Sequence, residues 1–300
     1  MTKEHQLKPT NRLIQYLSSV LLIMFSSNAI AQSYSYSSTL CHEAMIVNDN
    51  NIPERQSELE RYLHQRRKQF SKTASLQKTL FIHNHTSMDL DDFHSLLVSQ
   101  ITSLNESFSV DSLTYQKLTG LSAEDNNNIQ TITFDGIDNI VTGDLPWQDW
   151  SISDIISVIP ESIPVYVYDN LPEEVGLGYA HYPWLGRDQY RRIVTSVDAL
   201  KLETDYGIMT HLMGHYLGLY SLTGPSDCAD DHVSDTPIHN CAMPMCESSE
   251  ITSTCDNQPM MIDNYMSHAP IDCKDQLTIG QWKRILGIAS YYQEQTIEIE

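Results

Sequence analysis

Residues 210–224 read THLMGHYLGLYSLTG and place two histidines, His211 and His215, four positions apart. On a helix this spacing puts both imidazoles on one face, about one turn apart, where both can bind one zinc ion. Gly218 follows at a distance that lets the chain turn sharply out of the helix. A zinc hydrolase also needs a carboxylate between the histidines, but this position holds Leu212. The stretch therefore predicts a metal-binding helix that lacks its general base.

The histidine spacing by itself is a weak indication of a metal site. With 12 histidines in 300 residues, roughly half of one such pair is expected per chain by chance. The alternative interpretation is two helix histidines held by ordinary hydrogen bonds. One large class of zinc peptidases has a third histidine at the position of Ser221, and a neutral hydroxyl is a poor zinc ligand. Other segments of the chain are therefore needed to distinguish a zinc site from two hydrogen-bonded histidines.

Residues 1–31 have the pattern of a secretory signal peptide. A basic start precedes the apolar run Leu13–Phe25, and Ala29-Ile-Ala31 is a small-residue cleavage signal. The apolar run is too short to cross a hydrocarbon core of about 30 Å. We predict cleavage after Ala31, a secreted or periplasmic protein, and no membrane association after cleavage. The alternative is an uncleaved membrane anchor.

The charge of the chain limits its partners. The formal net charge is −21 at pH 7. Nucleic acids and anionic membranes repel such a protein, so neither is an expected partner. The acidity is typical of a well-solvated exported protein. It also suits calcium binding, although charge alone indicates no site.

The cysteines predict covalent links. Six cysteines follow the signal region, and five of them lie in the last quarter of the chain: Cys41, Cys228, Cys241, Cys246, Cys255 and Cys273. In an exported protein an even number of cysteines indicates disulfides, and the sequence leaves their pairing open. A cysteine zinc site is the alternative, and the absence of a CxxC pair argues against it.

The chain divides into an N-terminal extension, 32–75, and a larger domain, 76–300. The extension is a candidate pro-segment. Within the domain we expect an upper lobe, 76–220, in which strands and helices alternate, and a lower lobe, 221–300. From 221 to 275 regular periodicity gives way to Gly, Pro, Asp, Asn and Cys, which is typical of a loop-rich lobe held by disulfides.

Hydrophobic periodicity predicts the individual elements. The clearest is a helix over 90–104, because its apolar residues recur at helical spacing after Asp89. Further helices are expected over 51–78, 152–159, 208–219 and 278–292. Strands are expected over 78–83, 129–134, 162–168 and 193–197, with a polar loop over 105–128.

The segments around the histidine helix resemble the pappalysin family of metzincin zinc metallopeptidases. In that family an HExxHxxGLxH helix is followed by a DTP segment, an N-[FY]-M Met-turn, and a cysteine before a helix with Gly-Gln and Arg. The matching segments here are HLMGHYLGLYS (211–221), DHVSDTP (231–237), NYM (264–266), Cys273 and LTIGQWKR (277–284), with IPVYV (163–167) and GYAHYP (178–183) upstream. The resemblance covers about residues 75–290.

The resemblance implies a fold and a set of disulfides. The expected class is α+β and metzincin-like: a twisted mixed β-sheet with backing helices lies above an active-site helix. Below them lies an irregular disulfide-bonded C-terminal lobe that ends in a helix. The family pairing implies Cys228 with Cys255, and Cys273 with Cys246 or Cys241. Cys41 then takes the remaining cysteine.

The resemblance also implies metal sites. Zinc is the expected cofactor, with His211 and His215 as ligands. His268 is a candidate third ligand, because it stands two residues after the Met-turn methionine, Met266, where the family has a tyrosine close to the metal. An ordinary loop histidine is the alternative, and His232 on the DTP loop is a weaker candidate.

Calcium is a second expected cation by the same resemblance. Some relatives bind it, and hard carboxylate oxygens suit that ion. The acidic loop residues Asp230, Asp231 and Asp235 are the candidate calcium ligands. The alternative is that these acids cap turns.

Two departures from the family pattern affect the chemistry. Leu212 cannot accept a proton, and losing a general base costs roughly 10²- to 10⁴-fold in rate. Ser221 stands where the family has its third zinc-binding histidine.

These changes favour a secreted pseudopeptidase that no longer cleaves efficiently and binds a peptide or protein in the cleft where the family binds its substrates, along the edge segment Gly178-Tyr179-Ala180. The alternative is an active zinc endopeptidase that uses His211, His215 and a substitute ligand such as His268. An exported structural or adhesive protein is a third option, but the sequence contains no repeat or low-complexity tract of the kind that would support it.

Overall fold

The computed structural model describes residues 52–66, 76–110, 116, 129–130, 132–142, 162–172, 175–184, 191–201, 207–223, 228, 230–240, 246, 255, 257–269 and 273–297. The helices are α3 (Ile52–Arg66), α4 (Leu90–Ser107), α6 (Val197–Lys201), α8 (Ile208–Tyr216) and α9 (Ile279–Ile297). The strands are β1 (Leu76–His85), β2 (Ser109–Val110), β3 (Ile129–Gln130), β4 (Ile132–Thr142), β5 (Ser162–Tyr168), β6 (Gly178–Ala180) and β7 (Ile193–Ser196). None of these helices is long and apolar enough to cross a membrane.

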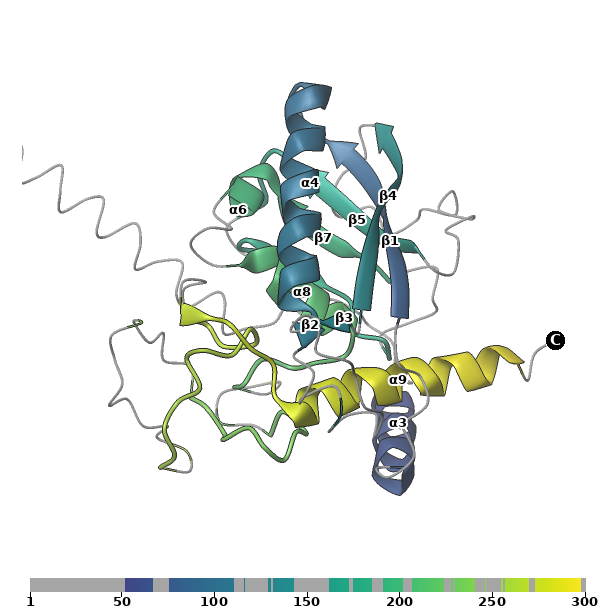
Figure 1. The fold of residues 1–300 in the computed structure, drawn as a ribbon, viewed down its shortest axis with the longest axis vertical. Coiled ribbons are helices and arrows are strands. Elements are labelled where there is room, and N and C mark those ends of the chain that lie inside the picture. Colours follow the sequence, from purple (N-terminus) through teal and green to yellow (C-terminus); the bar gives the residue numbers. More distant parts are fainter. Residues whose placement is uncertain are drawn as a thin grey trace, which may run out of the picture.

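A five-stranded sheet forms the upper part of the molecule (Figure 1). Its strand order is β4-β1-β5-β7-β6. The first four strands run parallel, and β6 pairs antiparallel with β7. Strand β5 is buried along almost its whole length, because apolar and β-branched residues fill both faces of a central parallel strand. The short β6 forms one edge of the sheet.

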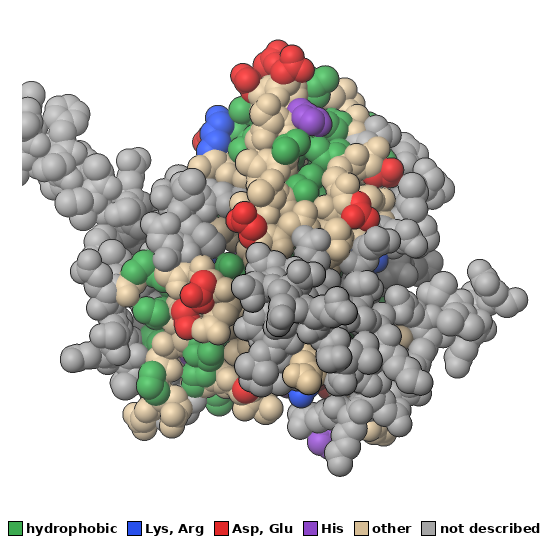
Figure 2. Space-filling model, viewed as in Figure 1, with side chains coloured by type: hydrophobic (Ala, Val, Ile, Leu, Met, Phe, Trp, Pro, Cys, Tyr) green, Lys and Arg blue, Asp and Glu red, His purple; other side chains and the backbone are tan. Residues whose placement is uncertain are grey.

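Helix α4 covers one face of the sheet and makes the main core with it. Leu80 and Ile82 of β1 are fully buried, as are Phe93, Leu97 and Leu104 of α4. Asp89 caps the helix, since its side chain accepts a hydrogen bond from the backbone N–H of residue 91. Acidic side chains gather at this tip of the molecule (Figure 2), where they stabilise the positive end of the helix dipole.

The lower part of the chain is irregular and ends in α9, as Figure 1 shows. Disulfides join Cys228 to Cys255 and Cys246 to Cys273. The structure thus contains the first implied pair and selects Cys246 as the partner of Cys273. Cys41 and Cys241 lie outside the described residues.

A capping box starts helix α9. The Thr278 hydroxyl accepts from the Gln281 backbone N–H at 3.1 Å, and the Gln281 side chain accepts from the Thr278 N–H at 2.9 Å. Asp235 adds a second cap from the lower lobe. Its carboxylate accepts from the Thr278 hydroxyl at 2.7 Å and from the Gly280 N–H at 2.8 Å.

Helix α3 belongs to the extension that was a candidate pro-segment, yet it packs into the folded domain. Leu59 and Leu63 join a cluster with Trp184, Tyr220 and Ile288. The helix lies against α9 (Figure 1). This part of the extension therefore contributes to the core.

Several predicted boundaries were wrong. The helix expected over 51–78 overlaps β1, which starts at residue 76. The loop expected over 105–128 contains the end of α4 and the strand β2, and β4 continues to residue 142. Helix α8 ends at residue 216, and residue 197 begins α6 instead of ending a strand. The helix expected over 152–159 lies outside the described residues.

The fold class is confirmed. The chain is mixed α/β with a twisted, mostly parallel sheet and helices against it, and two disulfides hold the C-terminal region.

Candidate metal centre

Helix α8 presents His211 and His215 on the same face. Every residue of the helix is buried, because it runs between the sheet and the lower lobe. The two imidazoles stand at 84° with centroids 4.5 Å apart. Their Nε2 atoms are 3.0 Å from each other. Two zinc-bound imidazoles in tetrahedral geometry place their nitrogens about 3.3 Å apart, so the pair is close to a ligating arrangement.

Backbone carbonyls set the tautomer of both rings. His211 Nδ1 lies 3.1 Å from the carbonyl of Tyr265, and His215 Nδ1 lies 2.8 Å from the carbonyl of Leu219. A carbonyl only accepts, so each Nδ1 carries the proton and each Nε2 carries a lone pair. The two lone pairs face each other, which favours a cation between them. Carbonyl partners at Nδ1 are also the usual support of zinc-bound histidines.

Burial keeps His211 in the neutral form that binds metals. Desolvation lowers the pKa of His211 well below its ordinary value, and the charges of His215, Lys274 and His268 lower it further. A neutral imidazole with its Nε2 lone pair exposed to the partner ring is a good zinc donor. The pair thus fits two of the three protein ligands of a catalytic zinc.

The position of the general base is apolar and closed. Leu212 is 3% exposed and faces the edge strand, since a Cβ placed on Gly178 would come within 3.0 Å of its Cδ1. The same Cβ would meet the Val194 carbonyl at 2.4 Å, so only glycine fits β6 at this point. A leucine between helix and strand offers no proton acceptor to a water at the histidine pair.

Ser221 and His268 are the described side chains nearest to the histidine pair that were predicted as possible third ligands. Ser221 Oγ lies 3.4 Å from His211 Nε2, and a neutral hydroxyl is a weak donor to zinc. The His268 ring is buried near His211, with centroids 5.7 Å apart. Among the described residues no three His, Cys, Asp or Glu side chains converge on one point. His232 lies elsewhere, against the Tyr220 ring at 5.6 Å.

The turn that carries Met266 supports the histidine helix from below. A Cβ on Gly214 would come within 2.3 Å of the Met266 sulfur, so the glycine between the histidines makes room for this methionine. The turn is fixed by Asn264, which accepts from the Met266 N–H at 2.9 Å and exchanges two hydrogen bonds with Gln281. Gly218 has φ +99°, which allows the sharp turn that follows the helix.

The candidate calcium residues accept hydrogen bonds from their own loop and from the start of α9. Asp230 accepts from the His232 N–H at 2.7 Å, and Asp235 caps α9. Asp231 accepts from the Val233 N–H and the Thr236 hydroxyl. Burial raises the pKa of Asp231 to about 7. Calcium binding by these acids stays a prediction, and the contacts show that each carboxylate accepts hydrogen bonds from the protein.

Sequence reasoning missed Lys274, the most unusual charge near the site. Its side chain is 9% exposed, and burial lowers its pKa to about 7. It lines a small pocket together with His211 and His268. Nothing in the local sequence marks it except its place directly after Cys273.

Comparisons with known proteins show what the chain is similar to. Residues 162–289 match the peptidase family described as pregnancy-associated plasma protein-A. A promirolysin mutant of Tannerella forsythia aligns with a TM-score of 0.54 and 18% identity, over 78% of this chain and 86% of that one. Mature Tannerella forsythia mirolysin with a cleaved peptide aligns with a TM-score of 0.48 and 20% identity, over 70% and 90%. No curated protein matches the sequence.

The resemblance to the pappalysin family is therefore confirmed. The family match contains the histidine helix, the DTP segment and the start of α9. The likeness to the promirolysin mutant, at this level of identity, supports the fold.

Proposed function

We propose that this chain, whose residues 162–289 match the pappalysin peptidase family, is an exported protein that binds peptides in the family's cleft and hydrolyses them poorly. The observation that carries the proposal is Leu212, buried against the edge strand at the place of the general base. In a zinc peptidase, bound zinc polarises the substrate carbonyl and acidifies a water. His211 and His215 are the residues that would hold such an ion, but Leu212 cannot take the proton.

The edge strand supports the binding half of the proposal. Among the described strands, β6 pairs with β7 alone, and it lies beside α8. An extended peptide can add to such an edge through main-chain hydrogen bonds. The His181 N–H donates to the Arg192 carbonyl, so in this antiparallel register the backbone groups of Tyr179 also face β7 and those of Ala180 face the open edge.

Peptide binding without cleavage is the first test. We expect the protein without residues 1–31 to raise the fluorescence anisotropy of labelled hexapeptide pools, and mass spectrometry to find the pools intact after hours. Ala180→Pro, which removes a backbone donor that faces the open edge of β6, should weaken binding, whereas Val98→Ala on the exposed face of α4 should not. Rapid cleavage by the unmodified protein would contradict the proposal.

Zinc retention tests the ligand set. After exhaustive dialysis we expect far less than one zinc per molecule in the wild type, because two imidazoles hold zinc weakly compared with three ligands. Ser221→His should retain about one zinc, and His211→Ala should retain none. Tight zinc in the wild type that is lost in His268→Ala would show that His268 completes the site, and would favour the active endopeptidase instead.

Export remains part of the proposal. The predicted signal peptide lies outside the described residues, and the two disulfides support it because such links persist in oxidising compartments.

A further inference from the structure

The turn over residues 218–221, directly after α8, holds the imidazole of His215. The Leu219 carbonyl lies in the middle of this turn and accepts from His215 Nδ1 at 2.8 Å. Every residue of the turn is buried. A hydrogen bond at Nδ1 orients a ligating histidine and determines which nitrogen faces the metal position. The contacts that fix the turn therefore also fix the ring of His215.

Both neighbours of this carbonyl are held by polar side chains of α3. On one side, Arg284 donates from Nε to the Gly218 carbonyl at 2.9 Å and from its Nη atoms to Glu60 of α3. On the other side, Gln56 donates to the Tyr220 hydroxyl. Because Gln56 stands four residues before Glu60, the two side chains share one face of the helix. This face thus bracketed the turn at two points from a part of the chain far away in sequence.

The apolar side of α3 supports the same histidine through an aromatic pair. Leu59 and Leu63 pack in one cluster with Tyr182 and Trp184. The Tyr182 ring stacks on Trp184 at 4.9 Å and meets the ring of His215 edge-on at 5.3 Å. Its hydroxyl lies 3.4 Å from His215 Nδ1. The cluster therefore carries the position of α3 to the same nitrogen that the turn holds.

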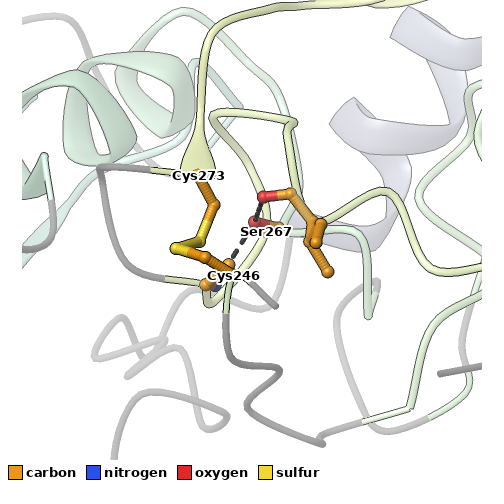
Figure 3. Close-up of a disulfide and its surroundings, with 5 residues drawn as sticks. Cys246, Ser267 and Cys273 are labelled. Carbon is orange, nitrogen blue, oxygen red and sulfur yellow. Dashed lines mark hydrogen bonds between the residues drawn. A yellow bond between two sulfur atoms is a disulfide. The ribbon is translucent and has the colours of Figure 1, made fainter. Parts of the chain in front are cut away.

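His211 is held by a different part of the chain. Its Nδ1 donates to the carbonyl of Tyr265 at 3.1 Å. Figure 3 shows Ser267, two residues further along this turn, beside the Cys246–Cys273 disulfide. The lower lobe thus supports one imidazole of the pair, and α3 supports the other.

We propose that Gln56 and Glu60 are positioning residues for His215, which makes α3 a functional part of the site and not a pro-segment that cleavage removes. Neither side chain contacts a ligand, since both act through the turn over residues 218–221. The inference goes beyond the proposed function, because it concerns how the histidine pair is held and not what the cleft binds.

Ring mobility tests the proposal in the zinc-free protein. The readout is ¹³C relaxation of histidine labelled at Cε1 in the protein without residues 1–31, with signals assigned by His211→Ala and His215→Ala. Both rings should be rigid in the wild type. In Gln56→Leu/Glu60→Gln we expect the His215 ring to gain motion on the nanosecond timescale, while His211 stays as in the wild type. General loosening of the fold would mobilise both rings alike.

Zinc affinity measures the consequence for the site. Adding Gln56→Leu/Glu60→Gln to the Ser221→His variant should raise the zinc Kd about tenfold or more. This is the usual effect of removing a group that orients a metal-binding histidine. The Kd is measured by competition with a chelating dye.

Two control variants separate positioning from lost stability. Glu58→Gln makes the same chemical change at an exposed position of α3, and Leu97→Ala weakens the core between α4 and the sheet. Both should leave the His215 ring rigid and, in the Ser221→His background, the zinc Kd within about twofold. Gln56→Leu alone keeps the ion pair and should show a smaller change in the same direction, so it serves if the double variant does not fold.

The outcomes decide the inference independently of peptide binding. A rigid His215 ring together with an unchanged zinc Kd in the folded α3 variants overturns it, and α3 then only stabilises the fold. Equal mobilisation of His211 and His215 overturns it as well. Because no peptide is used, a failure of the peptide-binding test contradicts the proposed function and leaves this inference to its own measurements.

Discussion

The double variant Leu212→Glu/Ser221→His is expected to cleave a denatured protein at least about 10²-fold faster than the wild type. The change restores a general base, which contributes roughly 10²- to 10⁴-fold, and a third imidazole. The scaffold for both is present, because the His211 and His215 Nε2 atoms are 3.0 Å apart and Ser221 lies 3.4 Å from one of them. The measurement is release of labelled peptides from denatured casein with zinc in the buffer.

A matched variant isolates the base. Leu212→Gln/Ser221→His carries the same ligands and a side chain of the same size without a carboxylate, so it should bind zinc but stay close to wild-type activity. Circular dichroism checks that each variant folds, since a carboxylate at this buried position is costly. If the unmodified protein already cleaves as fast as the double variant, the loss of the base has been compensated and the proposed function is wrong.

Breaking the ion pair between α3 and α9 is expected to cost about 3 kcal/mol of unfolding free energy. Arg284 is buried and donates from Nη1 and Nη2 to both Glu60 oxygens, while its Nε donates to the Gly218 carbonyl at 2.9 Å. Glu60→Gln removes the counter-charge and leaves the guanidinium in the interior. Removing one partner of a buried pair typically costs 3–5 kcal/mol, and the Glu60 side chain is 27% exposed, which favours the lower end.

Urea unfolding of the wild type and four variants measures this effect. Glu60→Gln, Arg284→Met and the double variant form a cycle in which the double change should cost less than the sum, because the two residues share one interaction. Lys283→Met, on the exposed side of the same helix, should stay within about 0.5 kcal/mol of wild type. An effect of Glu60→Gln as small as that of the control would show that α3 is only loosely attached.

The sequence could predict those helices and strands whose residue pattern results only from burial of one face or of the whole strand in the core. Helix α4 was expected over 90–104 because a single apolar stripe faces the sheet, and it spans Leu90–Ser107. Strand β5 matched its predicted limits of 162–168. In both cases burial against the core alone explains the choice of residues.

Elements shaped by distant contacts escaped prediction. Strand β4 continues through Asp135 and Gly136, which interrupt the alternation of a strand, because irregular pairing with β1 absorbs extra residues at this edge. The sequence of the charged helix α3 did not indicate that it packs against the domain, because Arg284, the ion-pair partner of its Glu60, lies 224 positions away. Its role depends on the tertiary contact and not on its own pattern.

In the candidate metal centre, too, local sequence patterns predicted some features, and tertiary contacts determine the others. The spacing of His211 and His215 predicted two rings on one face, and the structure brings them together. The place of Leu212 under β6 depends on Gly178, which no local pattern connects to the helix. Lys274 was missed because its burial results from the fold of an irregular lobe, where residue periodicity carries no information.

The contacts of α3 have a consequence for how the chain reaches its final state. Its hydrogen bond to Tyr220 spans 164 positions and its ion pair with α9 spans 224. Contacts between such distant positions close large loops and form slowly. During synthesis, the first described helix has to wait for the last one to emerge. We therefore expect the sheet and α4 to form before the two ends of the chain dock, and the fold to be completed at its termini.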